Sequence, residues 1–376
     1  MRIVIITQDY PDKNRSVFTF VEQLVFQFAS LGNECIVIAP FSITNALIHK
    51  SSIPKKISEH GLISIYRPKY ISFSNITVAG FNLSSLAFRH AVRFALAKIN
   101  GHIDVIYCHF WSSAIAGYSF AKSKKLPLIV ANGESKIPQL FKNDSKKHDF
   151  VNYISGVVSV STKNREESIK NGLTNKEKTV IFPNSIDLNK FYKKDKVECR
   201  RRLGIPLLDF IVIFVGWFNH RKGAKRLSEA LCSLDNPEIK AIFIGEGNVL
   251  PVYPKILFLG KINHDLMVDY LNCADVFVLP TLNEGCSNAI VEAMACGLPI
   301  ISSNLDFNHD ILNEDNSLLI DPLNISEIAE AIMKVKNDAS LRTRMGEASH
   351  GTALNLSISQ RASNILHFIN TQIKQS

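Results

Sequence analysis

Residues 276–303, VFVLPTLNEGCSNAIVEAMACGLPIISS, decide the fold that the sequence predicts. The apolar start of the stretch predicts a buried strand that Pro280 ends, because proline offers no amide hydrogen to a sheet. Ser287 or Asn288 is suited to cap the helix that follows, and Gly297 is suited to end it with a left-handed backbone. A second apolar strand then begins. The stretch therefore predicts a strand, a loop, a helix and a strand.

The helix of this unit is predicted to point its unpaired amides out of the carboxyl edge of a parallel sheet, where anions bind. A phosphate group would suit that position. Glu284 lies in the loop before these amides and Glu292 lies inside the helix. A carboxylate beside a phosphate is repelled unless it accepts hydrogen bonds, so the pair is suited to hold sugar or ribose hydroxyls. The alternative is that two surface glutamates occur at this spacing by chance.

Length and composition predict a globular protein of two domains. The chain has 376 residues, which exceeds the usual span of one domain, and 46% of them are hydrophobic. No stretch approaches the ~18 uninterrupted apolar residues of a membrane span, and the apolar run after Arg2 is too short for a signal peptide. We therefore expect a cytoplasmic protein. Its seven cysteines are scattered without C-x-x-C pairs, which predicts reduced thiols rather than disulfides or zinc ligands.

The net charge of +9 is distributed unevenly. Residues 1–190 hold 24 Lys and Arg against 13 Asp and Glu, whereas residues 191–376 hold 19 against 21. A basic half can favour nucleic acid, an anionic membrane face or a phosphorylated acceptor, and a merely solvated lysine-rich surface is the alternative. No nucleic-acid-binding motif accompanies the charge, so nucleic acid is not expected. The mixed apolar and basic stretch 81–99 could lie on a membrane surface or form an ordinary amphipathic helix.

The first hundred residues open in the manner of a Rossmann-like domain. Apolar runs at 1–7 and 35–39 predict strands, and the apolar residues of 17–31 have helical spacing. A later strand, 104–108, runs directly into His109. A histidine just past the carboxyl end of a parallel strand lies where α/β proteins place their chemistry, although a core histidine bonded to the backbone is the alternative.

Further apolar runs predict the remaining elements. Strands are expected at 63–66, 127–131, 156–161, 179–182, 210–215, 241–244, 256–259 and 318–320, and helices at 325–335 and 358–373. The basic segment 190–202 is interpreted as a linker and a domain boundary. After strand 210–215, glycines at both ends of a loop enclose Arg221 and Lys222, a pair suited to bind a diphosphate. Two solvated bases before a helix are the alternative.

The sequence resembles the retaining glycosyltransferases of family four, the glycogen-synthase-like group with the two-domain GT-B fold. The match runs from Glu284-Gly285 through Glu292-Ala293-Met294-Ala295-Cys296-Gly297 to Pro299, and it includes D-V-I-Y-C-H-F-W at 104–111 and Pro183-Asn184-Ser185-Ile186-Asp187. The family often has a histidine at the position of His109 in the 104–111 motif. At positions 183–187 the family has P-N-G-V-D. The family pattern G-R-L followed by K-G matches at Lys222. Trp217 occupies the usual arginine position, and Arg221 is the candidate substitute.

The resemblance implies an α/β protein of GT-B fold, with two Rossmann-like domains facing across a cleft. Residues 1–190, joined by a returning C-terminal helix at 358–376, would bind the acceptor, and residues 191–357 would bind a nucleotide-sugar. The implied activity is a retaining transfer of sugar from a UDP- or GDP-sugar to a glycan or lipid-linked acceptor in the assembly of a surface polysaccharide such as lipopolysaccharide. No D-x-D sequence occurs, so we expect neither a metal ion nor another cofactor. The basic half suggests peripheral contact with the inner face of the cell membrane.

The resemblance also assigns roles to individual residues. The catalytic set is Glu284, which contacts the transferred sugar, Lys222 and His109. The donor-binding set, in which Glu292 holds the ribose and Ile262 the base, is Arg221, Gly216, Ile262, Gly285, Ser287, Asn288, Ala289 and Glu292. The acceptor-side set is Ser16, Asn132 and Glu134, near positions where relatives have a glycine and a His-Gly pair.

Two other functions stay open at the level of sequence. A nucleotide-sugar 2-epimerase of the same architecture would convert a donor without any acceptor. A non-catalytic partner in a glycan assembly complex is the third possibility, because no glycine precedes the first helix near Ser16 and a tryptophan stands at position 217. Incubation with nucleotide-sugars would separate the three.

Overall fold

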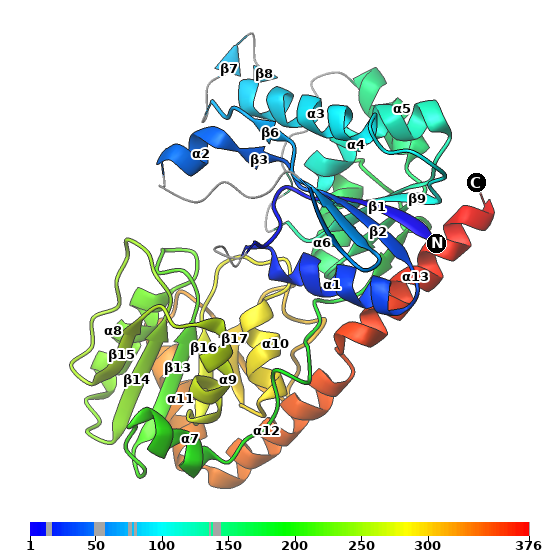
Figure 1. The fold of residues 1–376 in the computed structure, drawn as a ribbon. Helices are drawn as coiled ribbons and strands as arrows, with labels where there is room; N and C mark the ends of the chain where they lie inside the picture. The colour runs from blue at the N-terminus through cyan, green and yellow to red at the C-terminus, as the bar shows by residue number, and fades with distance from the viewer. Residues whose placement is uncertain are drawn as a thin grey trace. The chain divides into compact units, whose positions relative to one another are not determined.

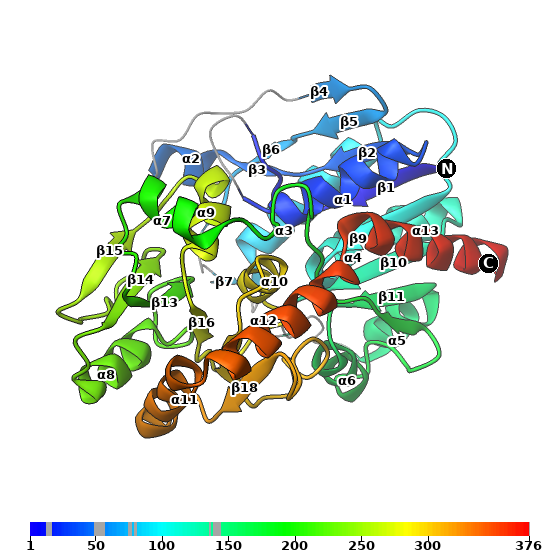
Figure 2. The ribbon, with the colours of Figure 1, turned by 90° about the horizontal axis from the view of Figure 1, so that it is seen from below.

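The computed structural model describes residues 1–12, 17–48, 57–73, 77–78, 81–134, 137 and 144–375. The chain divides into two compact units (Figures 1 and 2). The first unit comprises residues 1–160, 164–182 and 361–376, and the second comprises 161–163 and 183–360. The sequence analysis places the domain boundary at 190 and the start of the returning helix at 358, whereas the units change at 183 and 361.

The described residues of the first unit form an eight-stranded sheet ordered β12-β11-β10-β9-β1-β2-β5-β4. Its strands are β1 (Arg2–Ile6), β2 (Glu34–Ile38), β4 (Ile57–His60), β5 (Ile63–Tyr66), β9 (Val105–His109), β10 (Leu128–Asn132), β11 (Gly156–Ser159) and β12 (Thr179–Ile181). Neighbouring strands are parallel except β4 and β5. Two small ladders pair β3 (Phe41–Ser42) with β6 (Lys69–Tyr70) and β7 (Thr77–Val78) with β8 (Phe81–Asn82). Most of its central strands are continuous apolar runs because helices cover both faces.

The helices of the first unit are α1 (Thr19–Ser30), α2 (Ile43–Ile48), α3 (Leu83–Leu96), α4 (Trp111–Lys124), α5 (Asp144–Tyr153), α6 (Thr162–Lys170) from Asn164 onward and α13 (Ile358–Gln375) from Arg361 onward. Helices α3, α4 and α5 lie above the sheet in Figure 1, and α1 and α13 lie below it. Trp111 and Phe150 are fully buried in the core between the sheet and the upper helices. Under α13, a Cβ atom on Gly156 would lie 2.6 Å from the ring of Phe368, so the helix packs closely on β11.

The second unit, in which residues 183–360 are all described, contains a six-stranded parallel sheet ordered β15-β14-β13-β16-β17-β18. The strands are β13 (Phe210–Val215), β14 (Ile239–Ile244), β15 (Ile256–Gly260), β16 (Val276–Leu279), β17 (Ile300–Ser303) and β18 (Ser317–Ile320). The helices are α7 (Lys196–Leu203), α8 (Ala224–Leu234), η1 (His264–Leu266), α9 (Met267–Asn272), α10 (Asn288–Ala295), α11 (Ile325–Asn337) and α12 (Ala339–Leu354). Helix α8 contacts α11, and α10 contacts both α9 and α12.

Among the parallel strands of each main sheet, the chain order reverses at one point. In the first sheet β1 lies between β2 and β9, and in the second β13 lies between β14 and β16. Loops that leave the two central strands at such a point diverge to opposite faces, and ligands of open parallel sheets bind in the crevice between them. The sequence prediction of two Rossmann-like domains is confirmed, and the strand order adds the position of the binding edge.

One segment differs from its sequence interpretation. The basic stretch 190–202 is not a plain linker, because α7 begins after the N-cap Asp195, whose carboxylate accepts a hydrogen bond from the amide of Glu198 (2.7 Å). Arg200 of this helix is buried and donates to Asp275 (2.6 Å). A charged helix can therefore belong to the unit when one of its cations is paired inside. Within the described residues, no helix combines the length and the hydropathy needed to cross a bilayer.

Candidate functional site

The switch point of the second sheet brings together two loops that the sequence analysis singled out. Residues 216–223 follow β13 and residues 280–287 follow β16, and these two strands pair directly. Both loops therefore leave the same carboxyl edge side by side. They carry six of the predicted site residues, namely Gly216, Arg221, Lys222, Glu284, Gly285 and Ser287.

Glu284 is the centre of this cluster. Its side chain is buried, and its Oε1 atom accepts from Lys222 Nζ (2.7 Å), Arg221 Nη1 (2.9 Å) and Thr281 Oγ1 (2.8 Å). Arg221 also donates to the backbone carbonyl of Asn283. A nearly buried carboxylate needs such partners, since an unpaired charge in this position would be costly. The structure thus joins the three residues predicted to contact the sugar and the diphosphate, and it adds Thr281, which the sequence analysis missed.

Arg226 ties the two loops to each other. Its guanidinium donates to the carbonyl of His220 (2.7 Å) in the first loop and to the carbonyl of Pro280 (2.6 Å) in the second. The loops also approach closely at Gly223, which has φ +84°, because a Cβ there would lie 2.5 Å from the Pro280 oxygen. Only glycine adopts this conformation without strain in so little space. These contacts consequently hold in place the loop 216–223, which carries Arg221 and Lys222.

A third loop supports the first from the side of β14. Gly245 has φ +150°, and a Cβ on it would lie 1.9 Å from the carbonyl oxygen of Gly216. The amide of Phe218 then donates to the carbonyl of Glu246 (2.7 Å), and Val249 donates to that of Phe218 (2.9 Å). Position 245 therefore requires a glycine, because no Cβ atom fits there.

Helix α10 begins at the end of the second loop with unusual capping. Ser287 occupies the N-cap with an extended backbone, yet its side chain makes no capping hydrogen bond. The residue is 3% exposed, and its hydroxyl has no partner among the residues that the structure describes. Asn288 and Ala289 follow in the first turn. The amide of Val291 is the first to bond within the helix, to the Ser287 carbonyl (3.2 Å), so the amides before it belong to the open helix end.

Glu292 lies one turn further along α10, with 14% of its side chain exposed. Its Oε1 lies 3.6 Å from Nε2 of His264, whose ring packs edge-on against Phe191. Hydrogen bonding to Glu292 raises the pKa of His264 above its ordinary value, against an opposing effect of burial. Ile262, the predicted base contact, lies just before His264 in the loop after β15. The sequence analysis missed His264, because nothing in its own segment marks it.

His109 is the predicted residue that lies at the switch point of the first sheet. His109 ends β9 and is buried, with Nε2 lacking a partner within the described part of the chain. Burial lowers its pKa to about 3, with a further contribution from the positive charge of Arg361. The imidazole is therefore neutral at physiological pH. In that state it offers a neutral hydrogen-bonding group and not a cation.

Asn132 and Glu134 follow β10, next to β9. The side chain of Asn132 is fully buried and donates to Ser168 (2.6 Å) and to the Asn164 carbonyl (3.0 Å), both on α6, which is a structural role. The Glu134 carboxylate accepts from the amide of Trp111 at the start of α4 (2.8 Å), and burial raises its pKa to about 7. Ser16 lies outside the described residues.

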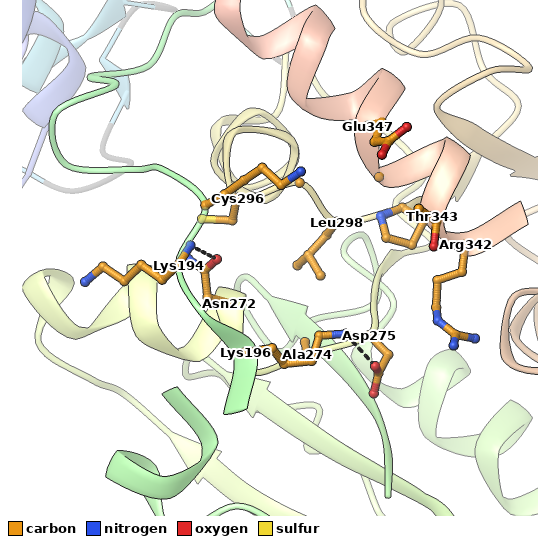
Figure 3. A pocket seen from close by; sticks show the side chains of 14 residues that line it. Lys194, Lys196, Asn272, Ala274, Asp275, Cys296, Leu298, Arg342, Thr343 and Glu347 are labelled. Atoms are coloured by element: carbon orange, nitrogen blue, oxygen red, sulfur yellow. Dashed lines mark hydrogen bonds and ion pairs between the residues drawn. The ribbon is translucent and has the colours of Figure 1, made fainter. Parts of the chain in front are cut away.

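A separate cavity of about 230 Å³ opens at the opposite, amino-terminal edge of the second sheet (Figure 3). Lysine and arginine side chains line it. Of these, Lys196 pairs with Asp275 (2.7 Å) and Lys194 pairs with Asp269 (2.9 Å). None of the predicted site residues lines it. The cavity is therefore distinct from the predicted donor-binding cluster at the carboxyl edge.

Known proteins are similar to this chain over most of its length. Residues 195–351 match the family model described as glycosyl transferases group 1. A Bacillus subtilis protein whose name assigns it to teichuronic acid biosynthesis as a glycosyltransferase, TuaC, is 28% identical over 356 residues, which cover 90% of each chain. The UDP-Gal:alpha-D-GlcNAc-diphosphoundecaprenol alpha-1,3-galactosyltransferase of Escherichia coli is 26% identical over 63% of this chain and 67% of its own.

Among solved structures, sucrose-phosphate synthase from Thermosynechococcus elongatus has the same fold, with a TM-score of 0.81, 18% identity and full coverage of both chains. The predicted family resemblance and the predicted enzyme class are thereby confirmed. The chain is a glycosyltransferase of GT-B fold that carries a glycosyl transferases group 1 domain at residues 195–351.

Proposed function

We propose that the second unit binds a UDP- or GDP-sugar and that the enzyme transfers its sugar, with retention of anomeric configuration, to a glycan or lipid-linked acceptor in surface polysaccharide assembly. The observation that carries the proposal is the pairing of Arg221 and Lys222 with Glu284 beside the open start of α10. Two cations, the Ser287 hydroxyl, which has no partner among the described residues, and the first amides of α10 are groups suited to bind a diphosphate.

Glu284 gives this site a second function. A diphosphate that pairs with Lys222 and Arg221 takes over the two cations, and the carboxylate then has lone pairs free for new donors. Hydroxyl groups of the transferred sugar are such donors. Glu292 and the backbone at Ile262 serve in the same way for the ribose and the base. The nucleotide would thus lie along the carboxyl edge from β13 to β15.

Departure of the nucleoside diphosphate needs its developing charge to be stabilised. Lys222, Arg221 and the amino end of α10 supply positive charge and hydrogen-bond donors at that place, which is the role of a divalent cation in other transferases. The sequence has no D-x-D pair to hold such an ion. We therefore propose a metal-independent reaction in which the acceptor hydroxyl attacks the anomeric carbon on the face that the leaving phosphate vacates. The sugar–phosphate bond breaks, and the leaving phosphate accepts the proton of the hydroxyl.

The acceptor is proposed to belong to surface glycan assembly because of the names of two relatives. One is named for teichuronic acid biosynthesis, and the other acts on a sugar linked to diphosphoundecaprenol. A lipid-linked acceptor would require the first unit to approach a membrane, and the protein is then expected to be cytoplasmic with peripheral contact.

Helix α3 of the first unit offers a surface for that contact. Residues 60–103 contain no aspartate or glutamate, and the outward side of α3 and its end alternate apolar and basic residues, including Leu86, Arg93, Phe94 and Lys98. Phe94 is 57% exposed, and it borders an apolar cavity of about 620 Å³ between α3 and β6. Exposed apolar groups set among cations suit the interface of an anionic bilayer.

A thermal-shift panel tests the donor proposal. UDP, GDP and ADP are compared at equal concentration, and the matching nucleotide is expected to stabilise the second unit by about 2.7 kcal/mol when present at 100 times its Kd. Lys222→Ala should weaken this effect at least ten-fold in Kd, whereas Lys225→Ala, an exposed neighbour on α8, should not. A protein that no nucleotide stabilises, or equal affinity in both variants, would overturn the donor site.

The reaction itself is tested with the donor that binds. Proton NMR of the first-formed product should show the anomeric configuration of the donor, and EDTA should leave the rate unchanged. An inverted product would refute retention, and a rate that EDTA abolishes and Mg²⁺ or Mn²⁺ restores would refute metal independence. Epimerisation of the donor sugar without an acceptor would instead identify the 2-epimerase reaction.

A further inference from the structure

The start of α10 lacks the side-chain capping that its sequence offers. Serine and asparagine at a helix start normally accept hydrogen bonds from amides of the first turn. Ser287 and Asn288 both stand there, yet the Ser287 side chain makes no capping bond. A helix end left open in a buried position needs another partner for its amides. The side chain of Asn288 is instead bonded to Asn184, a residue more than a hundred positions earlier in the sequence.

Asn184 reaches this helix end from the segment after β12. Its side-chain nitrogen donates to the carbonyl of Cys286 (2.9 Å) and to Oδ1 of Asn288 (2.8 Å). These two acceptors stand on either side of Ser287. The carboxamide of Asn184 therefore bridges the residue before the N-cap and the residue after it.

The segment that carries Asn184 is itself fixed within the second unit. Two residues on, the amide of Ile186 donates to the Leu356 carbonyl (2.8 Å), and the amide of Ile358 donates to the Ile186 carbonyl (2.9 Å). Ile186 is also buried. A short polar side chain on such a segment can hold a loop in one conformation, because little of its own freedom remains to be lost.

Both contacts have consequences for the helix amides. The bond to Asn288 occupies the side-chain oxygen that could otherwise fold back onto the first turn. The bond to Cys286 holds the backbone that leads into Ser287. Together they keep the helix end uncapped by its own side chains and keep the Ser287 hydroxyl in its buried position. Preorganised donors of this kind bind an anion without a cost of rearrangement.

We infer that Asn184 is a positioning residue for the diphosphate of the nucleotide-sugar, acting by holding residues 286–288 so that the amino end of α10 stays available to phosphate oxygens. The inference rests on the proposed donor site. It assigns a role to Asn184, which belongs to the P-N-S-I-D motif at residues 183–187. The side-chain contacts that the structure gives Asn184 are with the loop and the first residue of α10. Its effect should therefore follow the phosphate groups of a ligand and not its base or ribose.

The test compares ligands that differ only in phosphate. Calorimetric Kd values for UDP and uridine, or for GDP and guanosine if the guanine series binds, are measured with wild-type protein and Asn184→Ala. The variant is expected to lose about ten-fold in affinity for the diphosphate, the loss of one to two hydrogen bonds, while nucleoside affinity stays unchanged. Asn184→Gln, which keeps the carboxamide, should recover part of the loss. Asn189→Ala, an exposed asparagine of the same segment, is the matched control.

A double-mutant cycle covers the case in which Asn184→Ala also loosens the fold. Asn288→Ala removes the acceptor of one of the two bonds, so the effects of the two substitutions on diphosphate affinity should be less than additive. Additive effects, or equal losses for diphosphate and nucleoside, would overturn the positioning role. If the wild type binds diphosphate through Lys222 but Asn184→Ala binds it equally well, only this inference fails. If the wild type binds no nucleoside diphosphate, the donor site fails with it.

Discussion

At the scale of single residues, the chain controls charge by pairing and by burial. Glu284 accepts hydrogen bonds from three donors, whereas His109 is held neutral by burial and by a nearby arginine. Glu134 lies between these cases, since it accepts two backbone amides but has a raised pKa. The pKa of such a group links protein stability to pH.

Glu134 should therefore make the first unit less stable as pH rises. Its pKa of about 7 in the folded chain exceeds the ordinary value of 4.5, so its contribution is fully present below 4.5 and is lost as pH rises through 7. Urea unfolding of Glu134→Gln should lack this dependence, a difference of about 1–3 kcal/mol across the range. Glu177→Gln, an exposed glutamate of the same unit, should leave the dependence intact. Parallel curves for wild type and Glu134→Gln would contradict the raised pKa.

Sequence reasoning at this scale found the charged residues but not their supports. Glu284, Lys222 and Arg221 were predicted from a motif, and the structure brings them together. Thr281 and His264 were missed because a hydroxyl or an imidazole acquires its role only from a partner in another segment. Asn184 stood in a noted motif, but only the folded chain shows its contact with α10. The assigned roles of all predicted site residues remain predictions.

At the scale of elements, apolar runs were reliable guides and small-residue helices were not. The strand Val276–Leu279 was predicted with its observed bounds, since it is apolar throughout and ends at a proline. Helix α4 (Trp111–Lys124) was not predicted, because its alanines, serines and glycine surround the helix without a clear apolar face. Helix α7 was interpreted as a linker for its charge. Neither sheet order nor its switch point can be read from such local patterns.

The loops that follow β13, β14 and β16 pack closely against one another at glycines. Adding a single methyl group at such a glycine should therefore have a severe effect. Gly245→Ala would place Cβ 1.9 Å from the Gly216 oxygen, so the loop that carries Lys222 must move. We expect a loss of stability of several kcal/mol and weaker nucleotide binding, measured by thermal unfolding with and without UDP or GDP.

Gly351→Ala provides the contrasting case. This glycine lies inside α12, where a Cβ meets no atom within 4 Å, so alanine should stabilise the helix by up to about 1 kcal/mol. Unchanged nucleotide affinity is expected as well. A Gly245→Ala protein as stable as the wild type would show that the third loop does not brace the site.

At the scale of the whole molecule, the excess positive charge is concentrated in the unit that is proposed to bind the acceptor. The sequence established this imbalance, but only the structure shows that Phe94 is exposed beside Arg93 and Lys98. The sequence analysis left a membrane surface and an ordinary amphipathic helix open for residues 81–99. Helix α3 buries one side, through Phe88, Val92 and Leu96. The proposed membrane contact therefore involves its outward side alone.

Vesicle flotation tests this contact. Wild-type protein should float with vesicles of phosphatidylcholine containing 30% phosphatidylglycerol and not with pure phosphatidylcholine. Arg93→Glu is expected to weaken binding about ten-fold or more, because each cation near an anionic surface contributes about 1 kcal/mol. Lys176→Glu makes the same change of charge elsewhere on the first unit and should have little effect. Equal flotation of both variants, or no flotation of the wild type, would contradict a docking face on α3.

The pairing of Glu284 with both cations has a consequence for selectivity. A resting site that already carries its own counterion gives little advantage to chloride or inorganic phosphate, which can displace the carboxylate but offer it few partners in return. A sugar nucleotide would do both, since its phosphates would pair with the cations and its hydroxyls would donate hydrogen bonds to the displaced carboxylate. The empty enzyme would therefore resist occupation by the abundant small anions of its surroundings and respond to the one class of molecule that completes the exchange.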